Sequence, residues 1–294
     1  MAGVLSYRRL PSPLHAARAS VGALWAGTLV VASVLLYHPL LLAAIGVAAI
    51  CAGVASGVGQ VLRRALRWAP WFVVPIVIVQ VLISREGQTV FWRLGNLGPF
   101  GQGDLTVEAL VRGLVLALQV TDVILICALA SLAVDPDELL EKCARISFRS
   151  ALTASLALRM VPLLAADAAR LAEAQRTRPH PPARVRGKAL LLGAAFAGAL
   201  DRSLDVAATL ELRGISTGRR VASMRRPLSR HDLAFAASAA AVLALALIGR
   251  LTGAAAVDDG QVLRLATSMW TVLLCCALVA ATLLPFFDRR GVQR

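Results

Sequence analysis

Two arginine-bearing sequences, each at the expected end of a long helix, carry the most specific chemistry in this chain. Residues 174–179 contain Arg176 and Arg178, and residues 210–215 contain Arg213. A guanidinium is planar and holds a carboxylate with two parallel hydrogen bonds, so an arginine at a helix end can grip an acidic partner. The alternative is a structural cap, because the helix dipole also favours a cation at the C-terminus. The residues alone leave both interpretations open.

A single acid, Asp122, lies near the middle of an expected membrane span. An acid inside a bilayer is costly, so it is a candidate proton relay. The alternative is a structural carboxyl that hydrogen-bonds within the bundle, for example to its sequence neighbours Thr121 or Gln119. We favour the structural interpretation, because the only other intramembrane charge is Arg112, near the outer end of the same span.

The sequence contains no catalytic or metal-binding pattern. Gly187-Lys188 lacks the upstream glycine and the following Ser or Thr of a Walker A loop. H-E-x-x-H and G-x-S-x-G are absent, and the four histidines are isolated. The five cysteines form no C-x-x-C pair, and four of them lie in apolar runs. We therefore expect a protein that is not an enzyme and that has no metal site and no cofactor.

Composition predicts that these residues are carried by an all-α integral membrane protein. The chain is 58% hydrophobic, against about 45–50% in soluble domains, and its mean hydropathy is +0.71. A span needs roughly 20 apolar residues. We predict about six transmembrane helices, of which the third and fifth are short, at residues 21–37, 39–62, 68–84, 113–134, 233–248 and 265–287. The glycine-rich residues 85–104 predict a hairpin or a short irregular loop.

The basic residues predict the orientation in the membrane. The net charge is +14, and seventeen Lys and Arg fall within residues 135–232. The N-terminus, the connection after the second span and the C-terminus add Arg8, Arg9, Arg18, Arg63, Arg64, Arg67, Arg289, Arg290 and Arg294. Positive residues collect on the cytoplasmic side, so both termini and the long segment are expected there. This distribution explains the charge without nucleic acid, which we exclude as a partner.

The long basic segment divides the chain into residues 1–134, with four spans, residues 135–232, and residues 233–294, with two spans. Asp135-Pro136 predicts a helix start, since Asp caps and Pro suits the first turn. Long amphipathic helices are expected at residues 152–176, kinked at Pro162, and at residues 188–213, ended by Gly214. Both helices end at the arginines described above.

An ordered set of short sequences resembles the transmembrane T component of energy-coupling factor (ECF) transporters, the EcfT/CbiQ/BioN family. The set comprises Tyr7 with Ser12-Pro13-Leu14-His15, then Asp135-Pro136-Asp137-Glu138-Leu139-Leu140, Leu158-Arg159-Met160-Val161-Pro162-Leu163-Leu164, Ala174-Gln175-Arg176-Thr177-Arg178 and Leu210-Glu211-Leu212-Arg213-Gly214. The likeness covers most of the chain, and it lies in the order and spacing rather than in any one motif.

The resemblance implies a subunit of the bacterial inner membrane that couples two ABC-type ATPases to a substrate-binding S component for vitamin or metal uptake. In this family each coupling helix ends in Ala-Arg-Gly, and the arginine docks on an ATPase. By position these arginines are Arg178 and Arg213, with Gly214 retained and Arg176 as a substitute for the first. Arg159, Pro162 and Glu211 fall in the matching helix sequences as supporting residues.

Two other functions stay open on the sequence. A conventional ABC permease subunit would bind substrate itself and needs polar residues along its spans, of which this chain offers little beyond Gln119, Thr121 and Asp122. The second alternative is a membrane-embedded enzyme, for which no clustered acids or nucleophile are seen, or a non-transport anchor that recruits a cytoplasmic partner. The substrate cannot be named from this chain, since the S component selects it.

Overall fold

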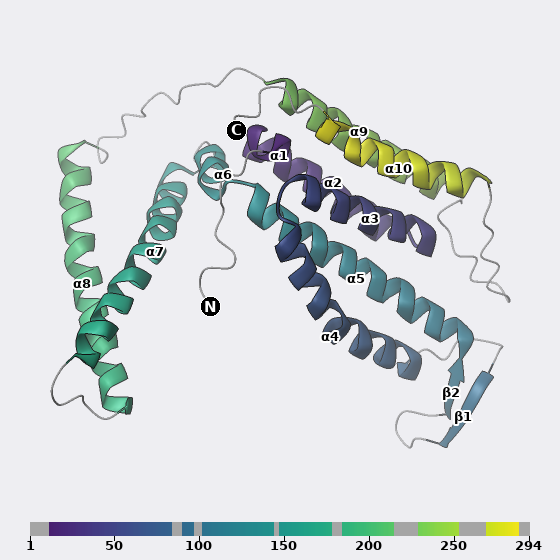
Figure 1. Cartoon of the computed structure of the whole chain (residues 1–294), viewed down its shortest axis with the longest axis horizontal. Helices are drawn as coiled ribbons and strands as arrows, with labels where there is room; N and C mark the ends of the chain where they lie inside the picture. The colour runs from purple at the N-terminus through teal and green to yellow at the C-terminus, as the bar shows by residue number, and fades with distance from the viewer. Residues whose placement is uncertain are drawn as a thin grey trace. The chain divides into compact units, whose positions relative to one another are not determined.

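The computed structural model describes residues 12–83, 90–96, 102–143, 147–177, 184–214, 229–252 and 269–287. These residues form helices joined by connections, plus one two-stranded hairpin, so the expected all-α membrane fold is confirmed with the hairpin as an addition (Figure 1). The elements are α1 Pro13–Ala16, α2 Ala19–Leu35, α3 Pro39–Ala55, α4 Gly59–Ile83, β1 Val90–Asn96, β2 Gln102–Thr106, α5 Val107–Ala133, α6 Pro136–Cys143, α7 Phe148–Arg176, α8 Arg184–Leu212, α9 Arg230–Leu251 and α10 Met269–Phe287.

The chain divides into two compact units. Met1–Glu138 and Leu228–Arg294 form the first, which we call the bundle unit. Leu139–Pro227 forms the second, which we call the α7–α8 unit. The bundle unit is therefore built from both ends of the sequence, and the α7–α8 unit is inserted between them.

An aromatic cluster joins three helices in the core of the bundle unit. Trp25 of α2 is fully buried, and its ring centroid lies 5.6 Å from that of Phe235 in α9 and 5.8 Å from that of Phe286 in α10. Trp25 Nε1–H donates to Ser238 Oγ at 3.1 Å, and Ser238 donates in turn to the Ala281 carbonyl at 2.6 Å. Because buried indole N–H groups need an acceptor, this relay fixes α2 against the two C-terminal helices.

Five of the described helices are long and apolar enough to cross a membrane, namely α4, α5, α7, α9 and α10. The predicted short third and fifth spans are wrong in length, because α4 has 25 residues and α9 has 22. The first two predicted spans correspond to the 17-residue apolar helices α2 and α3. By length and composition α7 also qualifies, where the sequence predicted an amphipathic helix outside the membrane.

The second predicted span, residues 39–62, is wrong at its C-terminal end. Helix α3 stops at Ala55, Gly57 adopts φ 77°, and α4 begins at Gly59. A positive φ suits glycine, so the turn forms there and not at the arginines that follow. Arg63, Arg64 and Arg67 consequently lie inside the first half of α4 rather than in a connection.

The remaining elements agree more closely with their sequence patterns. Strands β1 and β2 pair antiparallel, so the hairpin alternative for residues 85–104 is confirmed. Helix α6 begins at Pro136, and Asp135 Oδ1 accepts from the Asp137 N–H at 3.0 Å. Helices α7 and α8 each begin four residues before the predicted start. Pro162 lies within α7 without ending it, because the helix continues on both sides.

Candidate docking helices and the polar junction of the bundle

Helices α7 and α8 form an antiparallel pair held by side chains in two places. Near the turn between them, Gln175 Nε2 donates to the Gly187 carbonyl at 3.1 Å. Farther along, Arg202 Nη1 of α8 donates to Asp167 Oδ2 of α7 at 2.7 Å, and Arg170 pairs with the other carboxylate oxygen at 2.9 Å. One carboxylate thus serves two guanidiniums, one of them from the neighbouring helix.

The antiparallel arrangement places the candidate docking arginines at opposite ends of this pair. Arg176 is the last residue of α7 and Arg213 directly follows the last residue of α8. The path from Arg176 back to Asp167, across the contact to Arg202 and on to Arg213 covers about 20 residues of helix. At 1.5 Å per residue, roughly 30 Å separates the two ends. Arg178 lies outside the described residues.

The end of α8 is completed by backbone groups rather than by the Arg213 side chain. The Arg213 N–H donates to the Thr209 carbonyl at 3.2 Å, and the Gly214 N–H donates to the Glu211 carbonyl at 2.8 Å. Gly214 has φ 70°, the left-handed conformation that commonly ends a helix. The Arg213 and Arg176 side chains are exposed, and neither makes an ion pair or side-chain hydrogen bond within the described part of the chain.

The other predicted supporting residues lie on the surfaces of the same two helices. Arg159 and Pro162 occupy exposed positions on α7, and Glu211 is exposed in the last turn of α8. An acid near a helix C-terminus is disfavoured by the dipole. Glu211 therefore adds no stability to α8 through the dipole.

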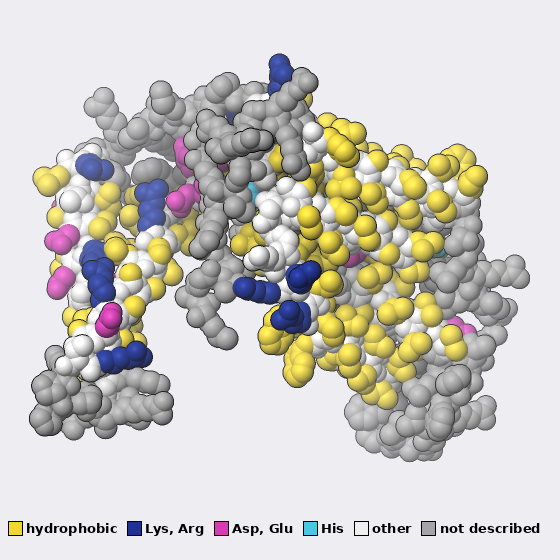
Figure 2. Space-filling model, viewed as in Figure 1, with side chains coloured by type: hydrophobic (Ala, Val, Ile, Leu, Met, Phe, Trp, Pro, Cys, Tyr) yellow, Lys and Arg dark blue, Asp and Glu magenta, His cyan; other side chains and the backbone are white. Residues whose placement is uncertain are grey.

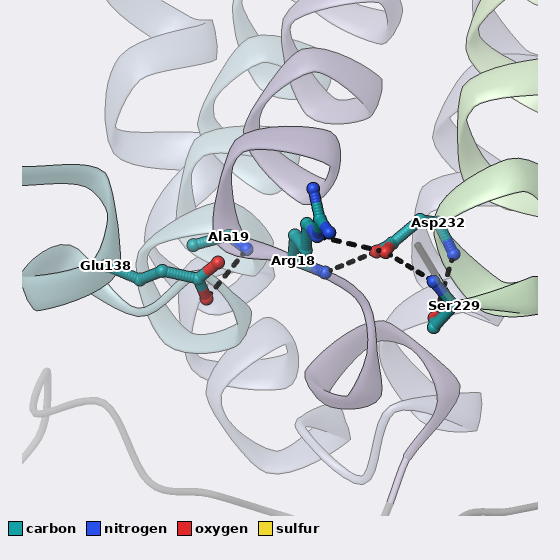
Figure 3. Close-up of polar contacts among 5 residues, drawn as sticks. All are labelled: Arg18, Ala19, Glu138, Ser229 and Asp232. Atoms are coloured by element: carbon teal, nitrogen blue, oxygen red, sulfur yellow. Dashed lines mark hydrogen bonds and ion pairs between the residues drawn. The ribbon is translucent and has the colours of Figure 1, made fainter. Parts of the chain in front are cut away.

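A polar junction at the start of α2 connects distant parts of the bundle unit (Figure 3). Asp232 of α9 is 2% exposed, and its Oδ1 accepts from the Arg18 N–H at 2.7 Å. Its Oδ2 lies 3.3 Å from Arg18 Nε and accepts from the Ser229 N–H at 2.9 Å. The Asp232 N–H donates to Ser229 Oγ, which completes a capping box. One buried carboxylate thus caps α9 and holds Arg18.

The same junction includes the start of α6. The Ala19 N–H, next in the chain after that of Arg18, donates to Glu138 Oε2 at 3.1 Å. The free amides at a helix N-terminus favour negative charge, so two carboxylates from α6 and α9 cap α2 together. Glu138 is the last bundle residue before the α7–α8 unit, and Ser229 lies just after it. Both chain segments that lead to that unit are therefore fastened to the start of α2.

The sequence does not predict this junction. In the sequence Arg18 is one of several basic residues that flank the first span, and Asp232 ends the long basic segment. The pattern Ser229-Arg230-His231-Asp232 is a capping-box signature that could have placed the start of α9 at Arg230 instead of residue 233. The pairing of Asp232 with Arg18 is long-range and leaves no local signal.

Asp122 lies in α5 and is 1% exposed. A Cβ added to Gly46 of α3 would stand 2.6 Å from Asp122 Oδ1, so the glycine makes room for the carboxyl. Asp122 Oδ2 has no hydrogen-bond partner among the described residues. The expected sequence-neighbour partners are wrong, since Thr121 donates to the Ala117 carbonyl and Gln119 to the carbonyls of Ser33 and Leu36.

Replacing Asp232 should destabilise the bundle unit. Asp232→Ala leaves the Arg18 and Ser229 amides without their acceptor, and we expect a loss of about 2–4 kcal/mol in the free energy of unfolding. Asp232→Asn keeps an acceptor oxygen and should lose less. Denaturation of the purified proteins in detergent measures both. In a double-mutant cycle with Arg18→Ala the two losses should not add, and full additivity would contradict the pairing.

Replacing Gly46 should destabilise the packing of α3 on α5. Gly46→Ala puts a methyl group against Asp122 Oδ1, and we expect about 1–2 kcal/mol of destabilisation despite the better helix propensity of alanine. Thermal denaturation in detergent measures the loss. Adding Asp122→Ala removes the clash, so Gly46→Ala should then cost little. If Gly46→Ala lowers the stability equally in the wild-type protein and in the Asp122→Ala variant, the carboxyl does not occupy the space beside Gly46.

The sequence matches one known protein family. The family of cobalt transport proteins designated CbiQ matches residues 11–223, which include every helix from α1 to α8. No curated protein matches the chain. Among the described residues, no group of three or more His, Cys, Asp or Glu could hold a metal ion. The family match covers most of the chain, and the apolar helices agree with it. The chain belongs to the CbiQ family of cobalt transport proteins and is a multi-pass membrane component of a transport system.

Proposed function

We propose that this chain is the coupling subunit, or T component, of an ECF-type importer. It transmits ATP-driven motion from two cytoplasmic ABC-type ATPases to a substrate-binding S component, for uptake of a vitamin or metal ion. Its membership of the CbiQ family supports a transport role. The chain itself is not catalytic in this account, and the two ATPases supply the chemical energy.

The observation that carries the proposal is the placement of exposed arginines at both ends of the α7–α8 pair. Arg213 directly follows the last residue of α8 at one end, and Arg176 is the last residue of α7 at the other. Arg178, which comes two residues later in the sequence, is the second candidate at that end. Each guanidinium can hold a carboxylate on a partner with two hydrogen bonds. A separation of roughly 30 Å suits two neighbouring protein subunits better than one small pocket. One ATPase at each end is the arrangement that uses both arginines.

The contacts within the pair suggest how motion would be transmitted. Asp167 and Arg202 hold the two helices together between their docking ends. Closure of the ATPases would displace those ends, and packed helices respond by rigid-body hinge or shear motion. The displacement would enter the bundle at Glu138 and at Asp232, the two residues whose carboxylates hold the start of α2.

The proposal places the chain in the bacterial inner membrane with both termini in the cytoplasm. The α7–α8 unit then lies on the cytoplasmic side, although α7 is apolar enough to span a bilayer. We favour a surface position for α7 because Asp167, Arg170, Glu173 and Arg176 lie in its C-terminal half. A lipid-facing span would bury these charges at high cost.

Removing the arginines should release the ATPases. Tagged wild-type protein from its host membranes should co-purify with an ABC ATPase at two copies per chain. Arg213→Ala or Arg178→Ala should each lose one copy, with at least about 10-fold weaker retention, as expected for a central interface arginine. Arg213→Lys should weaken ATPase coupling in part, since an ammonium cannot make the bidentate contact.

Arg230→Ala is the matched control, because it removes an exposed arginine from the first turn of α9 in the bundle unit. It should retain both ATPase copies. The docking proposal is contradicted if wild type brings down no ATPase, or if the variant that combines Arg178→Ala with Arg213→Ala retains as much ATPase as the control. The arginines would then be helix-terminal residues of a transport protein with another mechanism.

Asp122 is proposed to be structural rather than a proton relay. Asp122→Asn has nearly the same size and fits the space beside Gly46, so the complex should assemble and transport at close to the wild-type rate. Uptake of substrate into cells lacking the native gene measures this. An assembled complex without uptake would assign the carboxyl a role in proton movement.

A further inference from the structure

Three arginines on α4 have no assigned role. Arg63, Arg64 and Arg67 are all exposed. None of them makes a hydrogen bond or ion pair with any described residue. Their three charges lie within two helical turns and repel one another, so the cluster attracts an anion from outside the chain.

Two tryptophans follow directly on the same helix. Trp68 is 65% exposed and Trp71 is 75% exposed. On a helix, residues four apart are surface neighbours, so Arg64 lies beside Trp68 and Arg67 beside Trp71. Figure 2 shows basic side chains near the first half of α4, next to the apolar surface of the bundle unit. Tryptophan prefers the membrane interface, where its ring meets both acyl chain and headgroup.

The rest of α4 gives the depth of this cluster in the membrane. One side of α4 packs closely on α5 at Gly113. A Cβ added to this glycine would lie 3.4 Å from the Cα of Val77 in α4. The opposite side exposes apolar residues along the helix, namely Phe72, Val74, Ile78, Val79 and Leu82. From Arg64 to Ile83 the helix rises roughly 29 Å, close to the thickness of the hydrocarbon core. The arginines therefore lie at headgroup depth.

We propose that Arg63, Arg64, Arg67, Trp68 and Trp71 form a binding site for the headgroup of an anionic phospholipid. The guanidiniums hold the phosphate with charge-assisted hydrogen bonds. The indole rings lie along the glycerol and upper acyl chains. The site depends on α4 crossing a membrane and not on the coupling function. An acidic protein surface offers the same charge, but it would provide no apolar groups to contact the two tryptophans and the apolar face of α4.

Lipid retention tests the site directly. The full-length protein, purified with whatever subunits accompany it, is exchanged into mixed micelles that contain phosphatidylglycerol and phosphatidylcholine, and bound lipid is counted by native mass spectrometry. Wild type should retain phosphatidylglycerol preferentially. Each Arg→Gln change should weaken that preference by roughly fivefold, the effect of one basic residue at a membrane surface. Free glycerol phosphate should not displace the lipid, because it lacks the acyl chains.

The control is Arg289→Gln, Arg290→Gln and Arg294→Gln, which removes the same charge after α10. It should retain the preference for phosphatidylglycerol, whereas the α4 variant that combines Arg63→Gln, Arg64→Gln and Arg67→Gln should lose it. Equal loss in both variants overturns a local site. Normal lipid retention with loss of an ATPase from the α4 variant also overturns it and assigns the arginines to a protein contact. If the α4 variant does not elute from gel filtration as one species, the wild-type protein is tested with brominated lipids, which quench the fluorescence of tryptophans they contact. Brominated phosphatidylglycerol should then quench more than brominated phosphatidylcholine, and equal quenching overturns the site.

Discussion

The structure of the bundle unit depends on the acceptors that bind the free backbone amides at the start of α2. The amides of Arg18 and Ala19 have no partner within their own helix, and each is instead bound by a carboxylate, from Asp232 and Glu138. Those carboxylates belong to the residues on either side of the inserted α7–α8 unit. Local capping of one helix thereby fixes the two points at which the chain leaves the bundle and returns to it.

This arrangement holds the start of α2, the start of α6 and the start of α9 together within the bundle unit. Trp25 extends the connection from the start of α2 into the core, where its ring packs on Phe235 and Phe286. Packed aromatic groups of this kind move together rather than deform independently. In the proposed mechanism, a displacement of Glu138 or Asp232 would therefore move α2, α9 and α10 together.

The sequence predicted features that have a local cause. Asp135-Pro136 and Gly214 marked helix ends, because capping and left-handed backbone depend on the residue at that position. The turn at Gly57 was not predicted because the charges at Arg63 and Arg64 suggested a membrane boundary, whereas the helix that begins at Gly59 continues through both arginines. The partner of Gln119 and the space beside Asp122 were missed because α2 and α3 supply them, and long-range packing leaves no periodic signal in one sequence.

In the proposed assembly, the α7–α8 pair bridges two ATPases with its opposite ends. Photo-crosslinking amino acids placed at positions 176 and 213 of the same chain, in host membranes with ATP-bound partners, test it most directly. We expect each single position to yield an adduct with one ATPase, and the doubly substituted chain to yield a species that carries two. A doubly substituted chain that traps one ATPase only, or none, would contradict the claim.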